Sequence, residues 1–141
     1  MSADSADFRL DERLAADTLP VGDLALCRVL LMNDARYPWL ILVPRRAGLA
    51  ELIELEAGDR AQASVETDCA ARVLKTLTGC DKLNVAALGN MVRQLHIHVV
   101  ARFEGDAAWP APVWGRGAAE PYAPAAAELL IARLRTALEI D

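Results

Sequence analysis

Both histidines of this 141-residue chain lie in one octet, RQLHIHVV at residues 93–100, as His96 and His98. A histidine side chain ordinarily changes charge near neutral pH, so two of them at close spacing can share the work of a reactive site. One imidazole could attack phosphorus or carbon, the pair could act as acid and base, or both could bind a metal ion. The alternative without a function is that both histidines are ordinary strand residues. The pattern by itself does not decide among these interpretations.

The octet belongs to the apolar run at residues 94–103, which predicts a β-strand. Successive side chains of a strand point to opposite faces, so Leu95, Ile97 and Val99 are expected to form the core face. Both histidines then share the opposite face with Gln94. We therefore expect the two imidazoles to be near neighbours on the face that points away from this apolar set.

The flanking sequence predicts the elements that hold this strand in place. Three further strands are predicted from apolar runs, at residues 24–32, 39–44 and 82–88. Helices are predicted from apolar periodicity and end signals, at residues 10–17, 59–79 and 125–140. The first helix is expected to end at Pro20 and Gly22, and the second to begin with a capping box of Asp59 and Gln62. This order predicts an α+β domain with a mostly antiparallel sheet of about four to five strands and packed helices.

Chain length and composition predict one domain. With 141 residues, of which 54% are hydrophobic, the chain can bury one core, and residues 1–141 are expected to form a single unit. Residues 1–8 are expected to be a flexible tail, and residues 104–141 a C-terminal extension and helix. Trp109 and Trp114 lie in that extension, where we expect them to pack rather than to line a pocket.

Charge and cysteine content narrow the classes of partner. A net charge of -5 without a cluster of lysines and arginines disfavours nucleic-acid binding. No apolar run reaches the roughly 18 residues of a membrane span, and three cysteines without CxxC spacing are typical of a reducing compartment. We expect a cytoplasmic protein without a membrane anchor or cofactor. We also expect no structural metal, because two histidines and three scattered cysteines form no recognisable ligand set.

The motif and the order of elements resemble those of the histidine triad family. The family motif is His-φ-His-φ-His-φ-φ, where φ is an apolar residue, and QLHIHVVARF matches it with glutamine in the first histidine position. The resemblance extends over residues 10–115, including LVPRR at the end of the second predicted strand and WPAPVWG after the motif. It implies that His96 is the nucleophile that takes a nucleotidyl group from an α-phosphate, and that His98 contacts the phosphate.

Other residues of the expected site follow from the same resemblance. Gln94 stands where the family has its first histidine; its amide can form hydrogen bonds but cannot exchange a proton near neutral pH. Asn33 is implied as a contact to ribose, and Asn84 or Asn90 as contacts on the phosphate side. The connection GNMVR is expected to be shorter than the phosphate-holding loop of members that hydrolyse nucleotides. Ala47 stands where some members carry a further histidine after the two basic residues.

The resemblance implies a nucleotide-binding hydrolase or transferase that cleaves a phosphoramidate or phosphoanhydride bond through a covalent nucleotidyl-histidine intermediate. Its partner would be a nucleotide or a related small phosphate compound. The main alternative is a catalytically inactive nucleotide-binding or interaction module of the same fold, since a fold does not determine a function. A metal-binding histidine pair is the third hypothesis, and its missing ligands would have to come from cysteines or carboxylates elsewhere.

The protein is expected to be a homodimer. The family resemblance implies it, and an apolar-rich chain of this size with two tryptophans in its extension is expected to have apolar surface left to bury. Light scattering at micromolar concentration should therefore give twice the mass of one chain. The mass of a single chain under those conditions would contradict the prediction.

Overall fold

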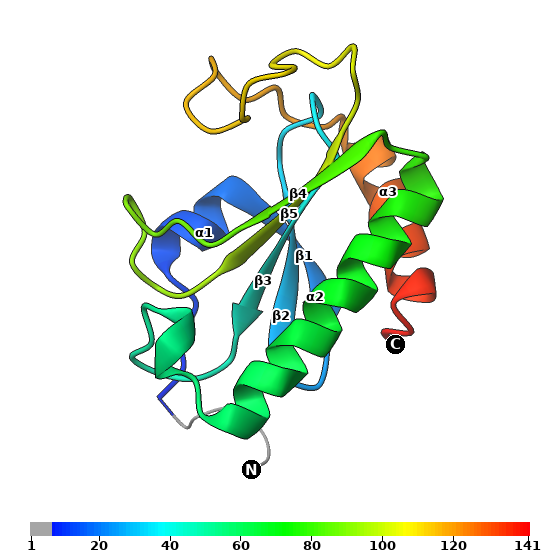
Figure 1. Ribbon diagram of the computed structural model, residues 1–141. Helices are drawn as coiled ribbons and strands as arrows, with labels where there is room; N and C mark the ends of the chain where they lie inside the picture. The colour runs from blue at the N-terminus through cyan, green and yellow to red at the C-terminus, as the bar shows by residue number, and fades with distance from the viewer. Residues whose placement is uncertain (1–6) are drawn as a thin grey trace.

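Five β-strands form one antiparallel sheet in the computed structural model, which describes residues 7–141. The strands are β1 (Thr18–Asp23), β2 (Cys27–Met32), β3 (Trp39–Pro44), β4 (Lys82–Ala86) and β5 (Ile97–Arg102). Their order across the sheet is β1-β2-β3-β5-β4, so β5, which carries most of the histidine motif, has a neighbour on each side (Figure 1). The predicted α+β class and the antiparallel pairing are confirmed.

Three α-helices and one 3-10 turn complete the described part of the chain. They are α1 (Glu12–Asp17), η1 (Leu52–Glu54), α2 (Ala57–Thr78) and α3 (Pro124–Ala137). The long α2 runs across one face of the sheet, with α3 beside it (Figure 1). It ends at Gly79, whose φ of 67° is a left-handed conformation that glycine adopts without a steric penalty.

The edge strand β1 is an element that the sequence pattern does not predict. Pro20 and Gly22, expected to end the first helix, lie inside β1, and the pairing with β2 is irregular between them. An edge strand tolerates proline because one of its sides has no partner strand. Gly22 has a φ of 153°, and a Cβ atom there would come within 2.5 Å of Ile140 Cγ2. Glycine therefore lets the C-terminal end of the chain pack against β1.

The predicted capping box at the start of the second helix is wrong. α2 begins after a residue whose side chain makes no capping hydrogen bond. Asp59 instead accepts hydrogen bonds from the guanidinium of Arg46, which follows β3, and Gln62 donates to Glu66 in the next turn. The Asp59 side chain thus binds the segment after β3 instead of capping its own helix, and Gln62 binds within the helix.

Both faces of the sheet are covered, and each face has its own cluster of buried apolar residues. The larger cluster lies under α2 and α3 and includes Leu95, Ile97 and Val99, which confirms the predicted core face of the motif strand. The smaller cluster lies on the histidine face and includes Trp39 from β3 and Val113 from the C-terminal extension. All 6 residues of β5 are consequently buried.

The C-terminal extension turns back over the histidine face at a buried ion pair. Arg102 at the end of β5 and Asp106 lie 2.7 Å apart, measured from Nε to Oδ2, and their side chains are 2% and 5% exposed. The Asp106 carboxylate also accepts hydrogen bonds from the backbone N–H groups of Phe103, Ala108 and Trp109. The pair therefore fixes the turn from which the extension folds back.

The N-terminal segment also contacts the histidine face. Residues 1–6 of the predicted flexible tail lie outside the described residues. Phe8, still within that predicted tail, is partly buried and packs against the smaller cluster. The Arg28 guanidinium lies over its ring, 5.6 Å from the centroid. This end of the predicted tail is therefore held by the fold.

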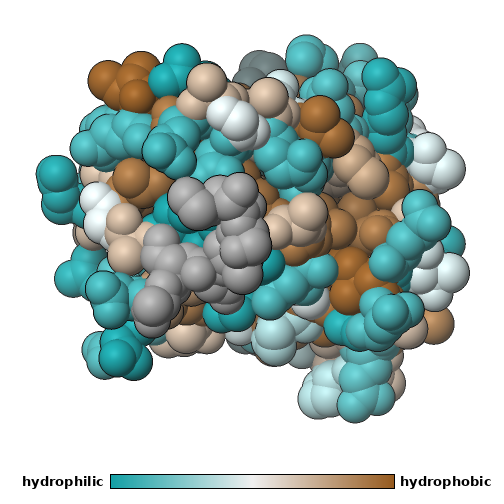
Figure 2. All heavy atoms as spheres, turned by 90° about the horizontal axis from the view of Figure 1, so that it is seen from below, coloured by the Kyte–Doolittle hydropathy of each residue, from teal (hydrophilic) through white to brown (hydrophobic). Residues whose placement is uncertain are grey.

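The surface mixes hydrophilic and hydrophobic residues. Viewed from below, hydrophobic residues gather mainly in the right half of the molecule (Figure 2). Exposed apolar side chains include Val85 on the edge strand β4, which is 50% exposed, and Met91 in the following loop, which is 80% exposed. Such residues are available to an interface, and the homodimer stays a prediction. Within residues 7–141, no helix has the length and apolar character needed to span a bilayer.

Removing the Asp106 carboxylate should destabilise the protein strongly. Asp106→Ala leaves the buried Arg102 charge without its partner and deprives backbone N–H groups of their acceptor, so the free energy of unfolding should fall by about 3 kcal/mol. Urea denaturation at pH 7 measures the loss. The matched control, Asp23→Ala, removes an exposed partner of Arg28 and should cost less than about 1 kcal/mol. Equal losses in the two variants would contradict the role assigned to the buried pair.

Candidate active site

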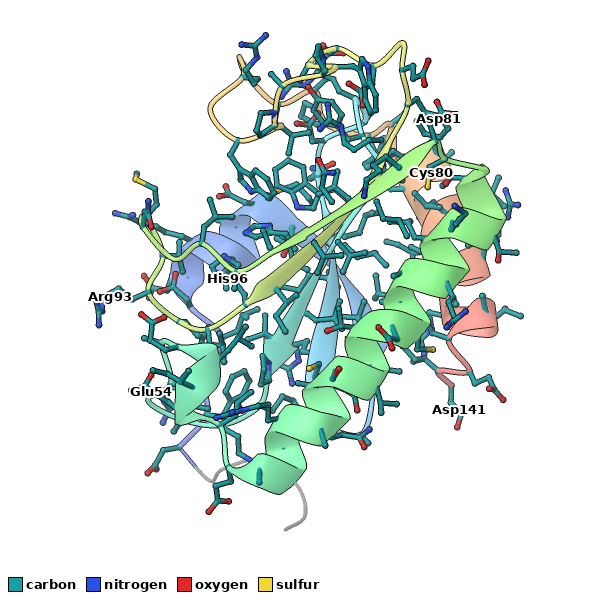
Figure 3. The ribbon with its side chains drawn as sticks, viewed as in Figure 1. Glu54, Cys80, Asp81, Arg93, His96 and Asp141 are labelled. Atoms are coloured by element: carbon teal, nitrogen blue, oxygen red, sulfur yellow. The ribbon has the colours of Figure 1, made fainter. Side chains whose placement is uncertain are left out.

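The two imidazoles lie together on the face of the sheet that the smaller cluster covers, His98 on β5 and His96 just before it. Their ring centroids are 4.8 Å apart, and His96 and His98 are 6% and 5% exposed. Figure 3 shows His96 within the molecule, whereas Arg93, three residues earlier, points outward. The alternation of the strand thus predicts the neighbouring imidazoles correctly, but it does not predict that their face is buried.

A backbone carbonyl fixes the orientation of His96. Its Nδ1 atom lies 2.6 Å from the carbonyl oxygen of Gln94. Because a carbonyl oxygen only accepts hydrogen bonds, Nδ1 must carry the proton, and in the neutral ring the lone pair is then on Nε2. His96 also borders a cavity of about 170 Å³ between η1 and the loop at residues 87–89. Its nucleophilic atom is therefore defined by a contact with its own chain.

A tryptophan indole fixes the orientation of His98 and favours the other neutral tautomer. Trp39 Nε1 donates a hydrogen bond to His98 Nδ1 over 3.0 Å. Since Nδ1 accepts, the proton of the neutral ring is on Nε2. Burial, with a smaller contribution from the neighbouring His96, lowers the pKa of His98 from 6.5 to about 3. At neutral pH, His98 is therefore an uncharged imidazole that can donate a hydrogen bond through Nε2.

Two tryptophans from distant parts of the chain enclose His98. The ring centroids of Trp39 and Trp114 lie 5.7 Å and 5.2 Å from that of His98, and the two indoles meet edge to face at 6.0 Å. Trp109 lies beneath the Arg102 guanidinium, 5.6 Å from its ring centroid. The expectation that the tryptophans of the extension pack rather than line a pocket agrees with the position of Trp109, but it is wrong for Trp114, which packs on His98 and also lines a cavity.

The sequence matches a family model over most of this fold. The HIT domain model matches residues 13–105, which is more than half of the chain. The chain belongs to the histidine triad family. No curated protein matches its sequence.

Solved structures of histidine triad proteins resemble this one over nearly their whole length. A histidine triad protein from Sinorhizobium meliloti is 52% identical, with a TM-score of 0.91 over 92% of this chain and 96% of that chain. One from Bradyrhizobium japonicum is 47% identical, with a TM-score of 0.91 over 93% and 98%. One from Marinobacter aquaeolei is 48% identical, with a TM-score of 0.92 over 94% and 96%.

In this histidine triad protein, Gln94 of the motif does not lie where the sequence analysis predicted it. β5 begins at Ile97, so Gln94 precedes the strand that was predicted to include it. Its side-chain amide donates to the carbonyl oxygen of Arg9 and accepts from the backbone N–H of Asp11, each over 2.8 Å. The amide therefore holds the N-terminal segment. It is the backbone carbonyl of Gln94 that orients His96.

The three asparagines suggested by the resemblance lie in different regions. Asn33 borders a second cavity, of about 430 Å³, that the two tryptophans around His98 also line. Asn84 on β4 accepts a hydrogen bond from the buried Arg102 guanidinium. Asn90 is exposed in the loop before β5. Of the three, Asn33 alone lines this larger cavity, and its Oδ1 accepts a hydrogen bond from the backbone N–H of Tyr122, whereas Asn84 stabilises the turn at the end of β5.

The loop before the motif is longer than the sequence pattern indicates. β4 ends at Ala86 and β5 begins at Ile97, so residues 87–96 form the connection. Both predicted strands around it, at 82–88 and 94–103, extended too far into this loop. The expectation of a short connection limited to GNMVR is therefore wrong.

Sequence reasoning missed Trp39 as a site residue. The predicted strand at 39–44 placed it correctly on a strand, but its partner depends on the register between β3 and β5. Ile41 pairs with His98 and Trp39 with Val100, so the indole reaches His98 diagonally across one face of the sheet. No signal in the local sequence specifies that register.

A metal site gains no support in the described part of the chain. Among residues 7–141, no three histidine, cysteine, aspartate or glutamate side chains are grouped closely enough to hold a metal ion. The third ligand required by the metal hypothesis is therefore not provided by these residues.

The neutral state of His98 should make stability depend on pH. Its pKa is lowered from 6.5 to about 3 in the folded protein, so the unfolded chain binds a proton that the folded chain does not bind. This contribution is full above pH 6.5 and declines as the pH falls toward 3. Between pH 7 and pH 5, it should lower the free energy of unfolding by about 2 kcal/mol. Urea denaturation should show this loss in the wild type and a smaller one in His98→Gln; equal losses would contradict the assignment.

Proposed function

We propose that this histidine triad protein is a nucleotide-binding hydrolase or transferase that acts at the α-phosphate of a nucleotidyl compound. His96 is the nucleophile and forms a covalent nucleotidyl-histidine intermediate. Family membership supports the nucleotide, and the opposite tautomers of the two imidazoles support the chemistry. The observation that carries the proposal is the hydrogen bond of 2.6 Å between His96 Nδ1 and the Gln94 carbonyl.

That hydrogen bond suits both states of a nucleophilic histidine. In the free enzyme it leaves the lone pair on Nε2, the atom that would attack phosphorus. As the bond from Nε2 to phosphorus forms, the bond to the leaving group breaks, and the ring becomes a cation that keeps its proton on Nδ1. The Gln94 carbonyl then accepts a charge-assisted hydrogen bond, which is stronger than the neutral one. The contact is thus more favourable after attack than before it.

The second step returns the enzyme to its starting state. Water, or another acceptor in a transferase, attacks the phosphorus and loses a proton to the solvent, while the bond to His96 Nε2 breaks and its electron pair returns to the ring. Hydrolysis releases a nucleoside monophosphate. His98 assists both steps as a neutral donor, with Nε2–H directed to a non-bridging phosphate oxygen. Developing negative charge is stabilised by such a preorganised donor in a buried site.

The two cavities offer room for different parts of a nucleotide. The cavity of about 170 Å³ beside His96 could hold about five waters, which is room for a phosphate group rather than a nucleoside. The cavity of about 430 Å³ falls in the ordinary range for ligand sites and has Asn33 and two indoles on its wall. We assign the nucleoside to this larger cavity, where the amide can meet ribose and an indole can meet the base.

One observation favours a second candidate function. His96 is only 6% exposed, and a nucleophile must reach its substrate. A protein that binds nucleotides without cleaving them would tolerate a buried His96 side chain. Detection of a covalent adduct separates the two candidates.

Intact-mass spectrometry after incubation with adenylylated compounds, dinucleoside polyphosphates and nucleoside phosphoramidates tests the proposal. The wild type should gain the mass of one nucleotidyl group. His96→Ala should gain none and should lose turnover at least about 1,000-fold, because the nucleophile is absent. Cys69→Ser is the control, since that exposed thiol is another possible site of modification and its removal should leave the adduct unchanged.

Folding of the His96→Ala variant can be checked by its thermal unfolding midpoint. An adduct that persists in this variant would contradict the role of His96. A wild type that binds nucleotides but forms no adduct and no product would favour the non-catalytic candidate.

A further inference from the structure

The hydrogen bond between Trp39 and His98 joins two buried residues. Trp39 is 6% exposed and His98 is 5% exposed, and the indole nitrogen lies 3.0 Å from Nδ1. An indole N–H only donates, so this contact permits His98 a single neutral tautomer. It also occupies the one atom of the ring that would have to bind a proton for His98 to become a cation. The indole fixes the tautomer, and the burial of the ring disfavours its cationic form, so His98 does not act as an acid.

We propose that Trp39 is the positioning residue that keeps His98 a neutral Nε2–H donor, and that the enzyme consequently selects nucleotidyl anhydrides, whose leaving group departs without a proton. The inference about the substrate rests on the function proposed above. The inference about Trp39 rests on the geometry of β3 and β5 alone.

Besides His96, the structure describes no imidazole among the neighbours of His98. Its strand partners are Ile41 on β3 and Ala86 on β4, and the extension contributes the Trp114 ring. The titratable group that acts on His98 is His96, which lies just before the same strand. Arg102, on the same face of β5, is a cation held by Asp106.

The surroundings of His96 likewise provide no imidazole acid besides His98. Gln94 occupies the neighbouring motif position and bears an amide, which does not titrate. Glu51 contributes to the cavity beside His96. Among the described residues that line this cavity, Glu51 and His96 are the only ones with an ionisable side chain.

The class of leaving group follows from this arrangement. When His96 Nε2 bonds to phosphorus, the electron pair of the breaking bond goes to the departing atom. A carboxylate or phosphate oxygen is stable as an anion at neutral pH, since the parent carboxylic acids have pKa values of about 4. An amine nitrogen must take up a proton as it leaves. A site with a neutral His98 therefore favours acyl-nucleotide and polyphosphate anhydrides over phosphoramidates.

The tautomer can be measured directly by 15N NMR of the two labelled imidazoles. In the wild type, His98 should show a non-protonated Nδ1 and a protonated Nε2, with no change between pH 8 and pH 5. Trp39→Phe keeps an aromatic ring but removes the donor, so His98 should populate both tautomers while the burial of the ring keeps it neutral in this range. Protonated Nδ1 in the wild type would overturn the role of Trp39 even if the variant failed to fold.

Trp114→Phe is the matched control. Its ring also contacts His98, at 5.2 Å between centroids, but its buried indole N–H has no hydrogen-bond partner among the described residues. This variant should keep the wild-type tautomer and the flat pH response. If Trp114→Phe altered the tautomer as much as Trp39→Phe, the effect would come from packing, and the proposed role of the indole hydrogen bond would be wrong.

Kinetics with matched substrates test the proposed preference for nucleotidyl anhydrides. The wild type should cleave an adenylyl anhydride at least about 100-fold faster, in kcat/KM, than an adenosine phosphoramidate with the same nucleoside, a difference of about 2.7 kcal/mol in barrier. Trp39→Phe should lower kcat/KM on the anhydride, because part of the His98 population then lacks the proton on Nε2. Equal rates on the two substrates would overturn the substrate assignment. Absence of turnover and adduct with both would overturn the function proposed above and the substrate class with it, whereas the NMR result would still decide the role of Trp39.

Discussion

The burial of β5 on both faces is the constraint on which the rest of the structure depends. One face meets α2 and α3 through Ile97 and Val99, and the other is covered by the N-terminal segment and the C-terminal extension. A strand in this position cannot leave polar side chains without partners, since unpaired buried polar groups are costly. The histidine face is therefore organised by hydrogen bonds as much as by packing.

Those hydrogen bonds differentiate two chemically identical side chains. His96 donates to a backbone carbonyl and keeps its lone pair on Nε2, whereas His98 accepts from an indole and keeps its proton on Nε2. The two Nε2 atoms thus have opposite roles, one as a nucleophile and one as a donor. Water would not enforce this distinction, because a solvated imidazole exchanges tautomers freely. The cover over the sheet is accordingly part of the chemistry and not only of the fold.

The cover itself depends on contacts between distant segments. The Arg102–Asp106 pair directs the extension back over the sheet, where Trp114 reaches His98. At the other end of the chain, the Gln94 amide binds the backbone at residues 9–11. A glutamine in this motif position therefore has a structural use that a histidine would not provide in the same way, because only the amide presents a donor and an acceptor side by side to an extended backbone. Its backbone carbonyl serves the nucleophile at the same time.

The sequence by itself determined the features that depend on local periodicity. The alternation around Leu95, Ile97 and Val99 specified which face of the motif strand meets the main core, because the side-chain period of a strand is fixed by backbone geometry. The same alternation put both histidines on the other face, and apolar runs located β2, β3 and α2 to within a few residues. The motif, together with the order of the elements, was sufficient to indicate the family.

Only the tertiary structure decided what surrounds the histidines. Propensity would end the first helix at Pro20, but pairing with β2 draws this residue into an edge strand. Asp59 has the sequence context of a helix cap, but the Arg46 guanidinium offers it a stronger partner. The tautomer of His98 depends on the register of β3 against β5, which brings Trp39 within hydrogen-bond distance although the two residues are 59 positions apart in the sequence. Such contacts arise from the simultaneous packing of several elements, and no local stretch of residues encodes them.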